Sequence, residues 1–173
     1  MTFADHGSAV VLALGSNLGD RLANLQGGVD VLCTGPGLTG VAVSPVYETA
    51  PLGGPVQPDY LNAVLVATTT LPPRAVLARG QAAETAMRRA RGQRWGPRTL
   101  DVDVIVYGNE VSDDPALTLP HPRAHERAFV LAPWHDVDPG AAVPGRGPIA
   151  GLLAAVGTTG VRLRRDASLR LPA

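Results

Sequence analysis

The order of the regular segments is the feature that most limits what this chain can fold into. Six stretches between residues 8 and 107 have the hydrophobic period of a strand or a helix. They predict a strand, a helix, two strands, a helix and a strand, at residues 8–14, 20–32, 41–48, 60–70, 72–90 and 99–107. This order is typical of the split βαβ, ferredoxin-like arrangement, in which an antiparallel sheet carries both helices on one face. We therefore predict an α+β fold, with the opposite face of the sheet free to carry a site.

Residues 109–173 are less regular, and we expect them to form C-terminal elaborations packed on this core. Short helical patterns occur at residues 126–131 and 149–156, and residues 133–148 are rich in Pro and Gly. A solvated tail is expected to carry the last four arginines, Arg162, Arg164, Arg165 and Arg170. Because no repeat or linker divides the chain, we expect residues 1–173 to form a single domain. We also expect the protein to be a monomer.

The last predicted strand brings two carboxylates together. Successive side chains of a strand point to opposite faces, so one face should hold Leu100, Val102, Val104 and Val106. Asp101 and Asp103 share the other face, with Cα atoms roughly 6.6 Å apart. Two carboxylates at this separation can hold one Mg²⁺ ion or bridge two. The alternative is a half-buried strand whose polar face meets water, and an isolated D-x-D pattern favours that alternative.

Arginines are concentrated just before this strand. Five of them fall within eleven residues: Arg88, Arg89, Arg91, Arg94 and Arg98. Guanidinium groups match phosphate oxygens bidentately, and a nucleoside triphosphate needs carboxylates for its metal beside cations for its phosphates. The combination favours a metal-and-phosphate site over a solvated strand face.

Composition excludes several other classes of function. All 15 basic residues are arginine, which rules out a Walker-type G-x-x-x-x-G-K-[ST] loop and a lysine Schiff base. The formal net charge is zero, which argues against a general nucleic-acid binder. Cys33 is the single cysteine, so no intramolecular disulfide can form, and no apolar run approaches the ~20 residues that span a bilayer. We expect a cytoplasmic protein that acts without nucleic acid or membrane.

Other candidate positions also have a structural explanation. The turn at residues 15–17 follows a strand and opens a helix, where backbone N–H groups can bind anions, but Gly and Asn are common there for geometry alone. Tyr60 and Asn62 share a strand face, and they either border a heterocycle or provide ordinary strand-edge polarity. Trp95 either stacks on a planar ligand or belongs partly to the core. The loop at residues 49–59 is longer than a hairpin loop, which favours a functional role.

Six sequence blocks, in order, resemble those of the 6-hydroxymethyl-7,8-dihydropterin pyrophosphokinases of the folate pathway. The blocks are L-G-S-N at 14–17, Y-E-T-A-P-L-G at 47–53, Q-P-D-Y-L-N at 57–62, R-W-G-P-R-T-L-D-V-D at 94–103, L-P-H-P at 119–122 and R-A-F-V-L at 127–131. The resemblance spans residues 9 to about 150. It implies a ferredoxin-like core that transfers the terminal pyrophosphate of ATP to the pterin's hydroxymethyl group, with two Mg²⁺ ions and AMP as the other product.

Carried over by motif, the resemblance assigns residues to each part of a site. Asp101 and Asp103 would bind the metals, and with Arg89 and Arg98 they are the expected catalytic residues. The residues expected to bind ATP are Gln81, Glu84, Arg91, Arg94, Trp95, Arg98, Ile105, Thr118, His121 and Arg127. Those expected to bind 6-hydroxymethyl-7,8-dihydropterin are Thr49, Ala50, Leu52, Tyr60, Asn62, Trp95 and Phe129, with the rings of Trp95 and Phe129 on its two faces.

Two positions depart from the pattern of the resembled family. Arg88 stands where the family often has Gly, and Ala116 replaces a basic residue of some members. The residues alone leave two other functions open. One is another DxD metal-dependent nucleotide transferase, which would release pyrophosphate. The other is a non-catalytic ferredoxin-like module that binds a nucleotide or RNA, although this chain lacks the paired aromatic residues on central strands that RNA-binding modules use.

Overall fold

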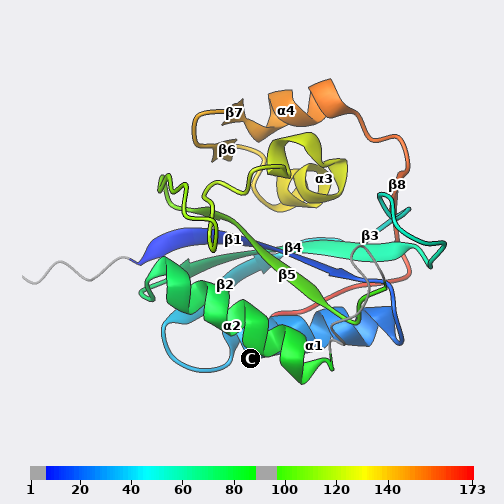
Figure 1. Cartoon of the computed structure of the whole chain (residues 1–173), viewed down its shortest axis with the longest axis horizontal. Coiled ribbons are helices and arrows are strands. Elements are labelled where there is room, and N and C mark those ends of the chain that lie inside the picture. Colours follow the sequence, from blue (N-terminus) through cyan, green and yellow to red (C-terminus); the bar gives the residue numbers. More distant parts are fainter. Residues whose placement is uncertain (1–6, 89–96) are drawn as a thin grey trace, which may run out of the picture.

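The computed structural model describes residues 7–88 and 97–173, and its sheet has the strand order of a ferredoxin-like core (Figure 1). The core elements are β1 Ser8–Ser16, α1 Arg21–Cys33, β2 Leu38–Val43, β4 Tyr60–Thr69, α2 Pro73–Ala86 and β5 Asp101–Tyr107. Their strands lie in the order β5-β1-β4-β2, and each neighbouring pair is antiparallel. The predicted α+β class and the predicted order of elements are confirmed.

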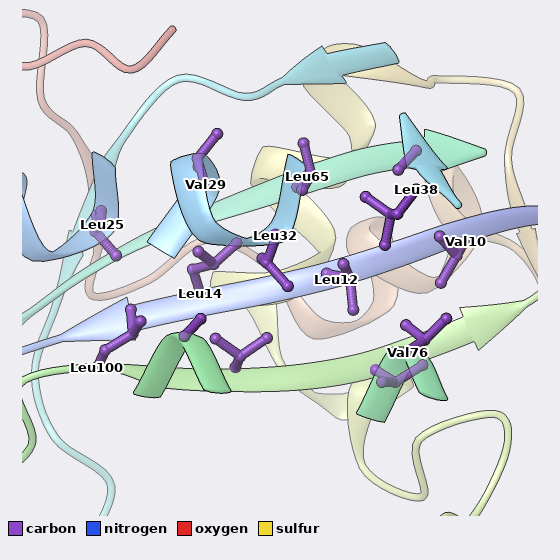
Figure 2. Close-up of a cluster of buried hydrophobic side chains, with 14 of the residues drawn as sticks. Val10, Leu12, Leu14, Leu25, Val29, Leu32, Leu38, Leu65, Val76 and Leu100 are labelled. Carbon is purple, nitrogen blue, oxygen red and sulfur yellow. The ribbon is translucent and has the colours of Figure 1, made fainter. Parts of the chain in front are cut away.

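Helices α1 and α2 cover one face of the sheet and enclose the main core (Figure 1). Asp20 caps α1, because its side chain accepts a hydrogen bond from the Ala23 N–H at 3.1 Å. The buried side chains in Figure 2 include Leu25, Val29 and Leu32 of α1, Val76 of α2, and Val10, Leu12 and Leu14 of β1. Within the described part of the chain, no helix has both the length and the apolar character that crossing a membrane requires.

The opposite face of the sheet is only partly free, because α3 Ala128–Val137 and α4 Ile149–Val156 pack over it (Figure 1). A second core lies beneath them, formed by Val11, Val64, Ile105 and Val106 of the sheet, Val130, Leu131 and Trp134 of α3, and Ile149 of α4. The short strands β6 Ala142–Val143 and β7 Gly147–Pro148 connect the two helices. The expected free face is therefore limited to one end of the sheet, where the residues that line a cavity remain accessible.

The strand predicted at residues 41–48 is divided in two. β2 ends at Val43, and β3 covers Tyr47–Thr49. Ser44 keeps its place beside β4, because its N–H donates to the Val64 carbonyl at 2.9 Å and its Oγ accepts from the Val64 N–H at 2.8 Å. Pro45 then has no N–H with which to continue the ladder. β3 pairs with β4 again, so that Thr49 lies opposite Tyr60.

A β-bulge interrupts the alternation predicted for β5. The pairing with β1 shifts between Val104 and Val106 and leaves Ile105 as the extra residue. Leu100, Val102 and Val104 consequently belong to the core under α1 and α2, whereas Val106 belongs to the core under α3. The prediction that all four apolar residues share one face is wrong for Val106, because one extra residue reverses the face of those that follow it.

The C-terminal arginines do not all lie on a solvated tail. β8 Val161–Leu163 pairs with β3 at the edge of the sheet. Arg162 and Arg164 form ion pairs with Glu48 of β3, each at 2.7 Å. The expectation is therefore wrong for these two residues, because strand pairing brings them to a carboxylate that is distant in the sequence. The other two, Arg165 and Arg170, are exposed as expected.

Candidate active site

A cavity of about 300 Å³ opens at the end of the sheet where β1 finishes and β4 and β5 begin. Five parts of the chain that are far apart in the sequence meet there. The lining consists of Ala13, Leu14 and Gly15 of β1; Thr49, Ala50, Pro51, Leu52, Gly53 and Gln57 of β3 and the following loop; Tyr60 and Asn62 of β4; Arg98, Asp101 and Asp103 of β5 and the segment before it; and His121, Arg127 and Phe129.

Asp101 and Asp103 bring negative charge to one wall of the cavity. Because both precede the bulge in β5, they remain on the same face of the strand. The register places Asp101 opposite Gly15 and Asp103 opposite Ala13, so no large side chain of β1 fills the space beside them. The Arg98 guanidinium lies 3.7 Å from the Asp101 carboxylate, whose side chain is 34% exposed. This wall therefore offers oxygen ligands and a cation at the same place.

Asn17 connects this wall to the loop that follows β3. Its side chain is buried, and its Nδ2 donates to Gln57 Oε1 at 2.9 Å and to the Pro58 carbonyl at 3.0 Å. Its Oδ1 accepts from the Arg98 N–H at 2.7 Å, while its own N–H donates to the Arg98 carbonyl at 3.0 Å. The turn at residues 15–17 thus has a structural role, because it fixes the backbone of Arg98 relative to the loop.

Thr49, Tyr60 and Asn62 form a polar wall where β3 meets β4. Asn62 Nδ2 donates to Thr49 Oγ1 at 2.7 Å, and both residues are buried. Gly15 allows β1 to pass close to this wall, since a Cβ atom there would lie 2.9 Å from Asn62 Oδ1 and 3.3 Å from a carbon of the Tyr60 ring. The Asn62 amide is consequently held in one orientation beside the cavity.

His121, Arg127 and Phe129 contribute the side of the cavity next to α3. The Arg127 guanidinium lies over the Phe129 ring, 5.5 Å from its centroid. His121 is placed by its backbone N–H, which donates to the Ile105 carbonyl at the bulge. Burial lowers the pKa of the His121 imidazole below its ordinary value; the Asp103 carboxylate opposes this shift, while nearby guanidinium groups add to it. The shift favours the uncharged imidazole, which can both donate and accept a hydrogen bond.

Four residues predicted to bind ATP lie outside the lining of this cavity. The Ile105 side chain is buried in the core under α3. Glu84 of α2 is buried and accepts a hydrogen bond from a backbone N–H of β5 at 3.2 Å, while Gln81 on the same helix is exposed. Thr118 donates its hydroxyl to a carbonyl of the preceding loop at 3.1 Å. All four stand outside the sequence blocks that carry the resemblance.

Four other predicted residues, Arg89, Arg91, Arg94 and Trp95, lie outside the described residues. Arg88, just before them, has a φ of 59°, in the left-handed region that favours glycine. This is the position where the resembled family often has Gly. An arginine in this conformation costs roughly 1–2 kcal/mol.

Six residues of the lining had no individual role assigned from the sequence, although four of them lie in the candidate turn at residues 15–17 or the candidate loop at residues 49–59. They are Ala13, Leu14, Gly15, Pro51, Gly53 and Gln57. All except Ala13 belong to the blocks that carry the resemblance, so membership of a block was the signal that could have found them.

A ferredoxin-like core with carboxylates, arginines and a polar amide wall in one cavity defines a small α+β enzyme suited to a phosphorylated substrate. The chain belongs to the 7,8-dihydro-6-hydroxymethylpterin-pyrophosphokinase family, whose model matches residues 11–139. It is 49% identical over 158 residues to the 2-amino-4-hydroxy-6-hydroxymethyldihydropteridine pyrophosphokinase of Mycobacterium tuberculosis, covering 84% of this chain and 82% of that one. The Pseudomonas aeruginosa enzyme of the same name is 40% identical over 152 residues, covering 88% and 94%.

Solved structures support the fold. A crystal structure of HPPK-DHPS in complex with substrates has a TM-score of 0.68 to this chain at 12% sequence identity, covering 87% of this chain and 43% of that one. At so low an identity, this likeness concerns the fold alone.

Family membership establishes the reaction. The chain is a pyrophosphokinase that transfers the pyrophosphoryl group of ATP to 6-hydroxymethyl-7,8-dihydropterin in folate biosynthesis. ATP is the co-substrate, and both substrates are small molecules. The two alternatives that the residues left open, another DxD transferase and a non-catalytic binding module, are thereby set aside.

Proposed function

We propose that the cavity is the active site, with the pterin at the wall where β3 meets β4 and the ATP phosphates along β5. One observation carries this proposal: Arg98, Asp101 and Asp103 line the same cavity as Tyr60 and Asn62. Transfer between two substrates requires both to be held in contact at a single site. A polar wall beside a charged wall suits a heterocycle next to a triphosphate.

We propose that Asp101 and Asp103 hold two Mg²⁺ ions. Mg²⁺ prefers oxygen ligands and usually takes one or two carboxylates, completing its shell with water and substrate phosphates. Among residues 7–88 and 97–173, no group of three or more His, Cys, Asp and Glu side chains gathers at one point. The two aspartates would thus leave positions for the oxygens of ATP. When bound, the ions neutralise phosphate charge and make the phosphorus easier to attack.

Arg98, Arg127 and His121 are proposed to hold the phosphates. Arg98 stands 3.7 Å from Asp101, too far for a strong ion pair, so its donors are available to a phosphate. Positive charge placed here stabilises the negative charge that develops on the bridging and leaving oxygens. The arginine-rich segment before Arg98 is proposed to extend this clamp with Arg89, Arg91 and Arg94.

The pterin is proposed to bind against Asn62 and Tyr60. One N–H of the Asn62 amide bonds to Thr49, which leaves its second N–H and its carbonyl oxygen for the edge of a heterocycle. Backbone groups of residues 49–52 would contact the rest of that edge. Phe129 and Trp95 are proposed to stack on the two faces of the ring.

We propose that the whole chain acts as one domain and as a monomer, without nucleic acid. The pairing of β8 with β3 supports the first point, because it joins the C-terminal segment to the sheet that carries the site. The formal net charge of zero supports the last.

Removing Mg²⁺ tests the proposed metal dependence. With ATP, pterin and excess Mg²⁺, phosphorus NMR should show AMP and the pterin diphosphate forming in equal amounts. Excess EDTA should lower the rate by about a thousandfold or more, and added Mg²⁺ should restore it. Undiminished AMP formation in EDTA would contradict the metal proposal, and ADP as the first nucleotide product would contradict pyrophosphoryl transfer itself.

A further inference from the structure

A group of charged residues outside the cavity holds the start of the loop that borders the pterin wall. We name this group the Glu48 cluster; its members are Arg21, Glu48, Asp59, Arg162 and Arg164. Glu48 directly precedes Thr49 of the cavity lining, and its side chain is 15% exposed. Its carboxylate accepts hydrogen bonds from three guanidinium groups, those of Arg21 at 2.8 Å, Arg162 at 2.7 Å and Arg164 at 2.7 Å.

Two of these arginines also hold the end of the loop. Arg21 Nη1 donates to the Asp59 carbonyl at 2.9 Å, and Arg162 Nη2 donates to Asp59 Oδ2 at 3.2 Å. Asp59 directly precedes Tyr60, which begins β4. Arg21 and Arg162 therefore each bridge Glu48 and Asp59, and the cluster sets the separation between the two ends of the loop.

The loop itself, residues 50–58, is weakly held elsewhere. None of its residues belongs to either hydrophobic core, and Leu52 and Val56 are exposed. Asn17 holds it near its end, through Gln57 and Pro58. A segment with so few buried contacts takes its position from its attachments, which makes the Glu48 cluster important for the first half of the loop.

The C-terminal segment that supplies two of the arginines is itself anchored. β8 pairs with β3 with Arg162 opposite Glu48. Beyond β8, Gln26 of α1 exchanges hydrogen bonds with the backbone of Arg170 at 2.9 and 3.0 Å, and Leu171 packs against the main core. Residues 161–171 therefore form a strap that runs from the main core to the Glu48 cluster. The strap lies beyond residues 11–139, the part that the family model matches.

The arginines also keep Glu48 charged. Burial raises the pKa of its carboxyl group, but the hydrogen bond and charge of Arg21, the charge of Arg164 and the hydrogen bond from Arg162 outweigh burial and bring the pKa below its ordinary value. The cluster is consequently an attraction between full charges at neutral pH, and salt should weaken its partly exposed members.

We infer that Glu48 is a positioning residue for the pterin, and that the C-terminal strap holds it there through Arg162 and Arg164. The inference rests on the proposed pterin subsite. Neither Glu48 nor Arg162 lines the cavity, so they act through the loop backbone and do not touch the substrate. Loosening the cluster should thus weaken pterin binding and leave the phosphate side of the site intact.

Steady-state kinetics of Arg162→Ala and Glu48→Gln test this inference. At saturating MgATP, the KM for the pterin should rise about fivefold for Arg162→Ala and about tenfold for Glu48→Gln, with kcat and the KM for ATP within about twofold of wild type. Higher ionic strength should raise the pterin KM of the wild type more than that of Glu48→Gln. Arg165→Ala, an exposed arginine of the same segment outside the cluster, and Arg74→Ala, which removes an ion pair with Asp114, are matched controls.

A further variant, Asn62→Ala, separates this inference from the proposed subsite. Arg162→Ala should keep the fold, since that side chain is 63% exposed, and thermal unfolding will check this. If Asn62→Ala raises the pterin KM but Arg162→Ala and Glu48→Gln do not, the positioning role of Glu48 and the strap is refuted, and the proposed pterin subsite is supported. If none of the three variants raises the pterin KM, the positioning role and the proposed pterin subsite are both refuted. An equal rise in the controls, or in the KM for both substrates, would indicate general destabilisation and overturn the inference.

Discussion

Replacing Asp101 or Asp103 with alanine should lower kcat by about a thousandfold or more at saturating ATP, pterin and Mg²⁺. Both carboxylates line the cavity, and the described residues offer no third ligand nearby to take over. Chromatography of AMP in the quenched reaction measures the loss. Asp113→Ala is the matched control, because it removes an exposed carboxylate outside the cavity and should leave kcat within about twofold of wild type.

The same two substitutions should leave the metal-free protein folded. Two carboxylates on one face of a strand repel each other when no cation is present, so the Tm of either variant in EDTA should match or exceed that of the wild type. Calorimetry provides this comparison. Full activity in either variant would refute the ligand assignment, and a joint loss of activity and Tm would make the role of the carboxylates structural.

Replacing Arg98 with alanine should lower kcat by about a hundredfold or more, because the site loses a cation at the phosphate to be transferred. The surrounding backbone should stay in place. The two hydrogen bonds between Asn17 and Arg98 involve the backbone N–H and carbonyl of Arg98, and alanine retains both groups. Arg98→Lys should recover only part of the loss, since lysine restores the charge without the planar fork of donors. Quench-flow measurement of AMP isolates the transfer step.

Arg146→Ala is the matched control for Arg98, because it removes an exposed arginine outside the cavity. Its kcat should equal that of the wild type. A kcat for Arg98→Ala within about threefold of wild type would place this guanidinium away from the reacting phosphate. The phosphate clamp would then have to be assigned to other arginines.

The core was predictable because its signals are local. Period-two and helical patterns depend on neighbouring residues, and they correctly predicted the order of the six core elements. The bulge at Ile105 was not predictable, since Val104, Ile105 and Val106 are all apolar and suit either face of the sheet, so only the pairing with β1 reveals the shift. The coverage of the second sheet face by α3 was missed for a similar reason, because a helical pattern does not state which surface the helix will cover.

The lining of the cavity, which is the proposed site, was predictable in part. Asp101 and Asp103 follow from strand periodicity, and the resemblance adds Thr49, Tyr60 and Asn62; all five line the cavity. The Glu48 cluster could not be foreseen, because it joins residues that are over one hundred positions apart and its arginines resemble those of a solvated tail. The turn that contains Asn17 suited either anion binding or simple turn geometry. The structural role of Asn17 depends on its hydrogen bonds to Gln57 and Arg98, which are distant in the sequence.

A crystal structure with Mn²⁺, a non-hydrolysable ATP analogue and the pterin would test the proposed site most directly. We predict anomalous scattering peaks about 2.1 Å from carboxylate oxygens of Asp101 and Asp103. The phosphates should lie between these peaks and Arg98, and the pterin should lie against Asn62. Metal ions held only by the nucleotide and away from both aspartates, or a pterin bound outside this cavity, would contradict the account.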